Sequence, residues 1–318
     1  MKKKIVSGWG NYPRVEANII YPFQGTELTK LIDFDDNYIS RGLGRSYGDS
    51  SLNDNVINFT KLNGILSFDM DSGIIHCEAG VSLAEIINYT ISKGWFLPVT
   101  PGTKYVTLGG AIAADIHGKN HHLEGTFCDH ITKINMILGD GSYISCSPSL
   151  NSDLFHATCG GMGLTGIILD AELKLKPVAG PMISLKNTKT NNLRETVDVL
   201  EKNKNIEYSV AWIDCQSKKD SMGRGIVMLG SHSKQESVIK KSREYKIPIP
   251  TPGFILNKYT IKYFNSFYYH FNSLTNPNKN IYYEPYFYPL DKIKNWNILY
   301  GKDGFFQYQF VIPYEAGF

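Results

Sequence analysis

A glycine-rich stretch with two arginines is the first candidate for chemistry in this sequence. It reads Arg41-Gly-Leu-Gly-Arg-Ser-Tyr-Gly-Asp49 and combines three glycines with two guanidiniums and a serine hydroxyl. Glycine lets successive backbone N–H groups point to the same side, and such a concave nest of donors binds anions. Because Arg41 and Arg45 add positive charge, the loop predicts a phosphate or pyrophosphate site, with a plain surface turn as the alternative.

Two further stretches are suited to binding a ligand through their backbone. The segment from Thr100 to His122 contains the pair Gly109-Gly110, followed by the polar run His117-Gly-Lys-Asn-His-His122. The missing Cβ atoms allow a ligand to approach the chain closely. A third loop, Cys159 to Gly166, holds four glycines directly before an apolar run and has the same property. Together these loops fit a flavin dinucleotide laid across backbone amides.

Two other nucleotide-binding motifs do not match. The first loop has the spacing G-x-G-x-x-x-G, and no apolar helical pattern follows Gly48, which disfavours a Rossmann unit. A P-loop fails because Gly110 and Gly118-Lys119 are too far apart, and because Asn120 stands where Ser or Thr must hold magnesium.

Metal and disulfide chemistry are also disfavoured, so we expect no metal site. His117 and His121 have the i, i+4 spacing of zinc-binding helices, but Gly118 and the lack of an adjacent glutamate argue against such a helix. Five cysteines are odd in number, scattered and without CxxC spacing. A reducing, cytoplasmic location is the natural expectation.

The elements that position the loops alternate between short strands and helices. Strands are predicted at Asn37 to Ser40, Ile74 to Glu78 and Ile167 to Leu175. A capping box, Ser82-Leu-Ala-Glu85, predicts a helix that ends at Gly94 and places Leu83, Ile86, Ile87 and Ile91 on one face. A hairpin is predicted around Gly139-Asp-Gly141, and a short helix at Asp153 to Thr158. This pattern indicates an α+β domain up to about Pro177.

After Pro177 the composition changes, and we place a domain boundary near Val178. A charged helix is predicted at Asn191 to Asn203, short strands around Ala211-Trp-Ile-Asp214 and Gly225 to Leu229, and a loop at the prolines of Lys246 to Gly253.

An aromatic tract follows, in which rings recur every four residues. Tyr259, Tyr263, Phe267 and Phe271 would form a stripe on one helix, with Lys258 and Lys262 close by. Such a helix suits a lipid or a membrane surface, but burial in the core is the favoured interpretation, because stripes of this kind are commonly buried.

Composition narrows the class of protein. At 318 residues with 42% apolar residues, the chain can bury the cores of two domains. A net charge of +3, with acidic and basic residues interspersed, gives no reason to expect nucleic-acid binding. No window approaches the roughly 18 apolar residues of a membrane span, so any membrane contact should be peripheral, at the inner membrane.

Long contiguous motifs make a family resemblance specific. The chain resembles the decaprenylphosphoryl-β-D-ribose oxidase family, within the vanillyl-alcohol-oxidase-like flavoproteins, in Arg41 to Asp49, Thr100-Pro-Gly-Thr103, Gly109 to His122 and Gly160 to Ile168. The similarity continues through Ala211-Trp-Ile-Asp214, Tyr288-Pro-Leu-Asp291 and Phe306 to Pro313, and so covers nearly the whole chain.

The resemblance implies a fold and a cofactor site. We expect an α+β fold, with a two-subdomain PCMH-type FAD-binding domain at 12–178 and a partly complete antiparallel-sheet substrate domain at 179–318. The residues that it assigns to FAD are Arg41, Gly42, Leu43, Gly44, Arg45, Ser46, Tyr47, Gly48, Asp49, Gly102, Thr107, Leu108, Gly109, Gly110, His117, Gly118, Lys119, Asn120 and Ile168. Many relatives attach FAD through a histidine at the position of Arg45. Because arginine cannot form that bond, we expect non-covalent FAD.

The resemblance also implies a reaction. The family oxidises the 2′-hydroxyl of a polyprenylphosphoryl pentose to a keto sugar, in the biosynthesis of arabinan precursors for cell-wall polysaccharide. A short-chain NAD(P)-dependent reductase then completes an epimerisation. Lys119 is the first candidate for catalysis and Tyr47 the second, with Trp212, Gln307 and Gln309 facing the sugar phosphate. If residues 306–310 form a strand, Gln307 and Gln309 share one face of it, and an exposed edge strand is the alternative.

One departure from the family pattern concerns the C-terminal side. The family continues beyond the glutamine strand with a segment that supplies a lysine and a tyrosine, so we expect a fragment or a shortened product. Two alternatives to the lipid-linked substrate therefore stay open. One is an oxidase of sugar lactones or other soluble sugar alcohols on the same scaffold, and the other is a flavin-binding protein without catalysis.

Overall fold

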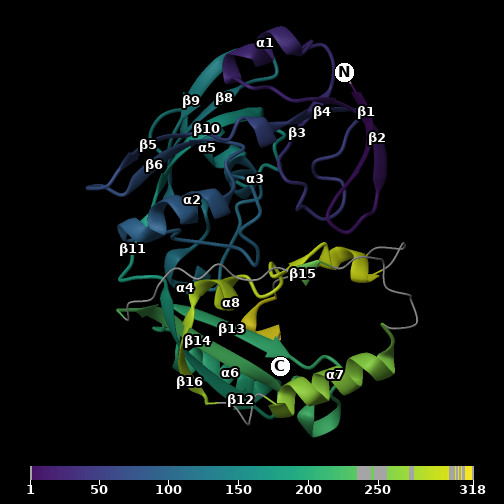
Figure 1. The fold of residues 1–318 in the computed structure, drawn as a ribbon, viewed down its shortest axis with the longest axis vertical. Coiled ribbons are helices and arrows are strands. Elements are labelled where there is room, and N and C mark those ends of the chain that lie inside the picture. The colour runs from purple at the N-terminus through teal and green to yellow at the C-terminus, as the bar shows by residue number, and fades with distance from the viewer. Residues whose placement is uncertain are drawn as a thin grey trace.

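The chain is arranged as an N-terminal half, coloured purple to teal in Figure 1, above a C-terminal half coloured green to yellow. The computed structural model describes residues 2–234, 245–246, 256–271, 276–300, 305, 307, 309 and 312–316. None of the helices in these segments has the length and apolar character needed to cross a bilayer.

The first sheet has the strand order β1-β2-β4-β3. Its strands are β1 (Lys2–Ser7), β2 (Arg14–Ile20), β4 (Asn55–Asn58) and β3 (Tyr38–Arg41). β4 pairs in parallel with both neighbours and is buried at Val56 and Ile57. Helix α1 (Leu28–Leu31) precedes β3, which ends at the arginine that opens the first glycine loop.

The second sheet is antiparallel throughout and supports the other two loops. Its strand order is β5 (Ile65–Asp69), β6 (Ile74–Glu78), β10 (Ile167–Lys174), β8 (Ile131–Ile137) and β9 (Tyr143–Cys146). The predicted strand at Ile74 to Glu78, the hairpin around Gly139-Asp-Gly141 and the helix before Cys159, here α5 (Ser152–Thr158), are confirmed. A two-stranded pairing of β7 (Trp95–Phe96) with β11 (Lys176–Pro177) closes this half.

The predicted capping box is present. Ser82 accepts from the backbone of Glu85, the Glu85 carboxylate accepts from the Ser82 backbone, and helix α2 (Leu83–Thr90) begins there. A 3₁₀ turn follows and ends at Gly94, whose φ of 81° is left-handed. The four predicted apolar residues of this helix lie in the core. Helices α3 (Leu108–Ala113) and α4 (His121–Glu124) complete the half.

The third sheet carries the C-terminal half. It has the order β13 (Tyr208–Ile213), β14 (Gly225–Ser233), β12 (Met182–Thr190) and β16 (Asn278–Tyr282), all antiparallel. The charged helix predicted at Asn191 to Asn203 is present as α6 (Leu193–Lys202), and Asn192 is its N-cap. This half also contains helix α8 (Tyr283–Phe287) and the short parallel pair β15 (Tyr245–Lys246) and β17 (Ile293–Lys294). This sheet starts just after the boundary predicted near Val178, and the boundary itself stays a prediction.

The aromatic tract forms helix α7 (Lys258–Phe271), but the expectation that its stripe packs into the core is wrong. Tyr259, Tyr263, Phe267 and Phe271 are all exposed. The helix is held to the sheet by its opposite side, where Asn265 donates to Asp214 and the Tyr269 hydroxyl donates to the Thr190 carbonyl. Residues spaced by four share a face, and here the face turned to the protein is the polar one. The proline loop that precedes this helix lies largely outside the described residues.

A buried aromatic cluster joins the two halves. The ring of Phe96 in β7 lies 5.3 Å from Tyr283 and 5.4 Å from Phe287, and Phe287 lies 4.8 Å from Tyr208. An ion pair between Lys104 and Glu284 crosses the same boundary. The loops of the first half are therefore held against α8 of the second.

Candidate cofactor and substrate site

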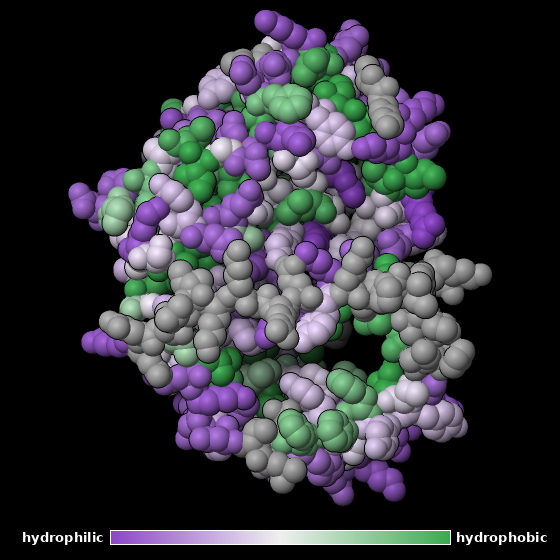
Figure 2. Space-filling view, viewed as in Figure 1, coloured by the Kyte–Doolittle hydropathy of each residue, from purple (hydrophilic) through white to green (hydrophobic). Residues whose placement is uncertain are grey.

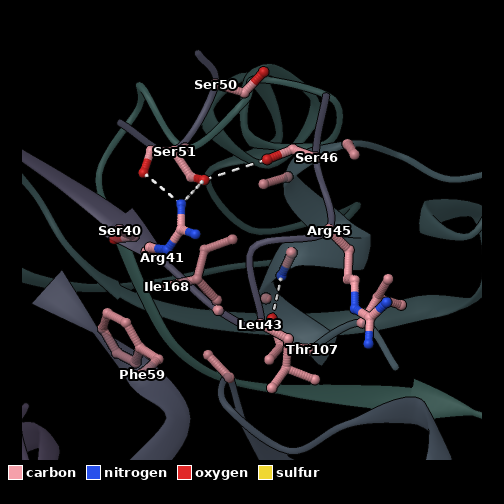
Figure 3. Close-up of a pocket in the computed structure, with 18 of the residues that line it drawn as sticks. Ser40, Arg41, Leu43, Arg45, Ser46, Ser50, Ser51, Phe59, Thr107 and Ile168 are labelled. Carbon is pink, nitrogen blue, oxygen red and sulfur yellow. Dashed lines mark hydrogen bonds between the residues drawn. The ribbon is translucent and has the colours of Figure 1, made fainter. Parts of the chain in front are cut away.

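A large cavity lies between the first glycine loop, the start of α3 and the beginning of β10. It encloses about 970 Å³ of space, partly open to solvent. The predicted cofactor residues that line it are Arg41, Gly42, Leu43, Gly44, Arg45, Ser46, Thr107, Gly109, Gly110 and Ile168. Figure 3 shows the first loop on one side of this space, with Thr107 and Ile168 facing it.

Close packing explains the glycines of the first loop. A Cβ on Gly42 would lie 2.2 Å from the Thr107 hydroxyl, which itself accepts from the Gly110 backbone at the start of α3. Gly44 has a φ of 64°, and a Cβ there would lie 2.2 Å from the Arg41 guanidinium. A side chain at Gly42 would push the two loops apart, and one at Gly44 would displace the Arg41 guanidinium.

Arg41 fixes the shape of this loop. Its guanidinium donates to the Ser51 hydroxyl at 3.1 Å, to the Ser51 carbonyl at 3.3 Å and to the Ser7 carbonyl at 2.7 Å. The Ser51 hydroxyl in turn lies 3.2 Å from that of Ser46, as Figure 3 shows. Burial lowers the pKa of Arg41. Part of the positive charge that the sequence assigns to an anion is therefore engaged by protein oxygens.

The backbone N–H groups of the same loop are available to a ligand. In the part of the chain that the structure describes, no residue from Leu43 to Gly48 donates its N–H to another protein group. Half-buried donors need partners, so the N–H groups of Gly44 to Tyr47, the nearby hydroxyls of Ser50 and Ser51 and the Arg41 charge suit an anion. The remaining wall, which includes Phe59, Val106 and Ile116, is apolar and suits a flat aromatic group. The residues thus fit a dinucleotide with a diphosphate bridge.

A second cavity is lined by residues that directly follow a wall residue of the first. Ile116 lines the first cavity, and the next residue, His117, lines the second together with Gly102, Gly118 and Lys119. Its far wall comes from the C-terminal half, at Leu200 of α6 and residues 209–211 of β13. The backbone N–H of Ser209 donates to the Lys119 carbonyl at 2.8 Å, which fixes the edge strand against this loop.

Lys119 is a half-buried cation with apolar neighbours. Its ammonium donates to the Phe287 carbonyl at 3.2 Å and lies 5.7 Å and 5.8 Å from the ring centres of Tyr286 and Phe287. Burial lowers its pKa from the usual 10.5 to about 8. The charged form is consequently present at neutral pH but is lost within the range of ordinary assays.

Arg45 extends away from the anion site. Its guanidinium stacks on Trp9, 3.8 Å from the ring centre, and also borders a smaller pocket with Tyr105 and Asp291. Burial lowers its pKa, and the charges of Asp291, Tyr105 and Tyr47 oppose this effect. Tyr47 packs edge-on against Phe305, and burial raises its pKa.

Several predicted residues line neither cavity. Leu108 is fully buried in the core, and Asn120 is buried with its amide donating to the Pro98 carbonyl. Gly48 and Asp49 are exposed, and Tyr47 shares no cavity with Lys119. These positions act, if at all, through the shape of the loops.

The predicted substrate residues of the C-terminal half also line neither cavity. Trp212 lies on β13 and packs its ring 4.8 Å from that of Tyr268 in α7. Gln307 and Gln309 are exposed and lie in no strand, whereas Phe306, Tyr308 and Phe310 lie outside the described residues.

Some residues of the site were not predicted. Ser51 anchors Arg41, and its position shortly after the glycine loop was the available signal. The Tyr288 hydroxyl pairs with that of Thr100 at 2.6 Å, and Phe287 holds Lys119. These two partners lie 188 and 168 residues further along the chain than the residues they contact, so only the quoted Tyr288-Pro-Leu-Asp291 motif, which begins directly after Phe287, pointed to this segment.

Comparison with known proteins identifies the family. Residues 31–147 match the model of a family described as FAD binding domain. The chain is 34% identical to decaprenylphosphoryl-beta-D-ribose oxidase of Mycolicibacterium smegmatis, over 98% of this chain and 72% of the relative. The chain belongs to the decaprenylphosphoryl-β-D-ribose oxidase family. As a member, it is an FAD-dependent oxidoreductase, and the predicted cofactor is confirmed.

More distant relatives share the scaffold. A putative D-arabinono-1,4-lactone oxidase of Neurospora crassa is 27% identical over 53% of this chain and 31% of its own length. The solved structure of an alkyldihydroxyacetonephosphate synthase superimposes with a TM-score of 0.59 at 15% identity, covering 69% of this chain and 47% of that one. This structural likeness, together with the family match, confirms the predicted α+β fold with its PCMH-type FAD-binding domain.

Proposed function

We propose that the protein oxidises the 2′-hydroxyl of a polyprenylphosphoryl pentose to the 2′-keto sugar. The observation that carries this proposal is the position of Lys119. A desolvated cation stands in a cavity that adjoins the dinucleotide-shaped cavity and is walled by the second domain. The substrate class follows from the relative in Mycolicibacterium smegmatis, whose name gives a phosphoryl-ribose as what it oxidises.

Within this reaction the chain has three tasks. The first loop holds the diphosphate of FAD without a covalent bond, since Arg45 stands where a histidine would be needed. When bound, FAD supplies the acceptor for the hydride that leaves the carbinol carbon. Lys119 offers a positive charge to the sugar phosphate or to the oxygen that loses its proton, and burial strengthens that charge because little water screens it.

The remaining assigned residues have supporting tasks in this proposal. Tyr47 packs edge-on against Phe305 and shapes the first loop. Trp212 closes the substrate side through β13, and the exposed amides of Gln307 and Gln309 are free to contact the sugar phosphate. Because the product is a keto sugar, its conversion into an epimer requires a hydride donor, and the family resemblance implies an NAD(P)-dependent short-chain reductase for this step. The lipid on the substrate requires peripheral contact with the inner membrane.

The match to a putative lactone oxidase favours one second candidate, a soluble aldonolactone as the substrate. Anaerobic mixing of the FAD-loaded protein with each compound separates the two, because reduction bleaches the flavin. Bleaching by a farnesylphosphoryl ribose and not by arabinono-1,4-lactone supports our proposal. The opposite pattern would identify the aldonolactone as the substrate. A yellow protein that neither compound bleaches would exclude both candidate functions.

A further inference from the structure

Helix α7 presents a row of exposed rings that the fold leaves uncovered. Its exposed fractions are 72% for Tyr259, 77% for Tyr263, 59% for Phe264, 59% for Phe267 and 51% for Phe271. We call these five residues the aromatic stripe. Figure 2 shows aromatic side chains, pale green and lilac, gathered over this helix at the lower right of the molecule.

The helix is fixed so that the stripe faces outward. Asn265 donates to the buried Asp214 carboxylate at 2.8 Å, and the Tyr269 hydroxyl donates to the Thr190 carbonyl at 3.1 Å. The same carboxylate pairs with Arg224, so the anchor is part of a network. With about 100° between successive residues, the stripe lies on the side opposite Asn265 and Tyr269. Rotation of the helix would bury the rings only by breaking these bonds.

The charges on the helix indicate which kind of partner contacts the aromatic stripe. The sequence from 258 to 271 contains Lys258, Lys262 and His270 and no acidic residue. Both lysines are exposed, and the Lys258 ammonium lies 5.0 Å from the ring centre of Tyr259, the first residue of the stripe. A second copy of the chain would bring the same cations to a two-fold interface, without a carboxylate from the helix to pair with them. An anionic lipid surface complements both the rings and the lysines, since aromatic residues sit well at the headgroup level and lysines pair with lipid phosphates.

The helix is also joined to the substrate cavity. Tyr268 of α7 packs against Trp212 of β13, and the two preceding residues of that strand, Val210 and Ala211, line the cavity that holds Lys119. Strand β13 therefore connects the exposed helix to the pocket for the sugar phosphate. This step rests on the proposed function, because only a lipid-linked substrate has to be collected from a bilayer.

We propose that α7 lies flat on an anionic bilayer, with the aromatic stripe at the headgroup level, so that the lipid-linked sugar phosphate passes from the membrane into the Lys119 cavity. The length of the helix, about 21 Å for 14 residues, is enough for an interfacial anchor and too short for a span. Binding of this kind is reversible and depends on anionic lipid.

Flotation with lipid vesicles tests the proposal on the FAD-loaded chain. We expect the protein to float with phosphatidylcholine vesicles that contain phosphatidylglycerol, and to float weakly with pure phosphatidylcholine. The double variant Tyr263→Gln, Phe267→Gln should bind about tenfold more weakly. Ile5→Gln, which removes a side chain that is 75% exposed on β1, is the matched control and should bind as the wild type does. Equal binding by the double variant and the control would overturn the proposal.

Two further readouts separate this inference from the function on which it rests. With farnesylphosphoryl ribose dispersed in detergent, the double variant should bleach its flavin at the wild-type rate, and with the same compound in anionic vesicles it should be about tenfold slower. If the wild type bleaches with neither preparation, the proposed function is wrong. If the wild type and the double variant oxidise the vesicle-bound compound equally well, the function stands and the role of α7 is wrong. Sedimentation showing a wild-type dimer that the double variant dissociates would assign the stripe to self-association and overturn the membrane role.

Discussion

The pKa of Lys119 leads to the sharpest test of the site. Below about pH 8 its ammonium is charged, and above that pH the charge is lost, because burial favours the neutral amine. A cation that binds phosphate or an alkoxide acts only when charged. We therefore expect kcat/KM to be level at neutral pH and to fall as the pH rises through about 8, by about tenfold per pH unit beyond it.

The size of the effect follows from the contact that is lost. A hydrogen bond from a charged donor contributes about 1.5 to 3 kcal/mol, so Lys119→Met should lower kcat/KM by about 10- to 150-fold. A rise in KM alone would assign the charge to the phosphate, whereas a fall in kcat would assign it to the reacting oxygen. Lys119→Arg, which stays charged at all working pH values, should retain part of the activity and lose the fall near pH 8.

The assay is anaerobic flavin reduction followed by absorbance from about pH 6 to pH 10, a range that spans the titration of this amine. Lys61→Met, which removes an exposed lysine that lines neither cavity, is the matched control. A wild-type profile that stays level through pH 8, or a Lys119→Met variant within twofold of the wild type, would refute the role of this cation.

Three other predictions concern the first loop. Arg41→Ala removes three hydrogen bonds and should weaken FAD binding by about 10- to 150-fold, measured by flavin fluorescence. The control Arg14→Ala on β2 should leave the affinity unchanged, and an unchanged affinity in Arg41→Ala would contradict the placement of the diphosphate. Gly44→Ala places a side chain on a residue with left-handed backbone geometry, against Arg41, and should lower the free energy of unfolding by about 1 to 3 kcal/mol, measured by thermal unfolding. Gly139→Ala, where a Cβ meets nothing within 4 Å, is the control. Acid precipitation should release yellow FAD to the supernatant, since Arg45 cannot bond to it, and colour in the pellet would contradict non-covalent binding.

Local signals predicted the scaffold well. The Ser82–Glu85 capping box and the left-handed Gly94 are decided by residues within one turn of each other, so the sequence alone locates α2. The glycines at 42 and 44 were also readable as sites of close approach. The sequence did not predict which groups lie against them, because Thr107 and the Arg41 guanidinium come close to these glycines only in the folded protein.

The failures share one physical cause. A four-residue period shows that Tyr263 and Phe267 share a face, but it does not show whether that face meets protein or solvent. In α7 the orientation of the helix is fixed by Asn265, whose hydrogen-bond partner Asp214 lies 51 residues earlier. Arg41 is a similar case, because its strongest acceptor is the Ser7 carbonyl of β1, and the sequence offered no reason to pair them.

The same reasoning explains why the substrate side depends on both halves. Lys119 belongs to the FAD-binding half. The carbonyl that accepts its hydrogen bond, the rings that desolvate it and the strand that binds its backbone nevertheless all come from beyond residue 200. Without those partners its ammonium would face water, and its pKa would return toward 10.5. The cofactor loop, by contrast, obtains Ser7, Ser51 and Thr107 from its own half. Cofactor binding is thus a property of the first half, whereas a cation tuned to titrate near pH 8 arises only when the second half packs against it.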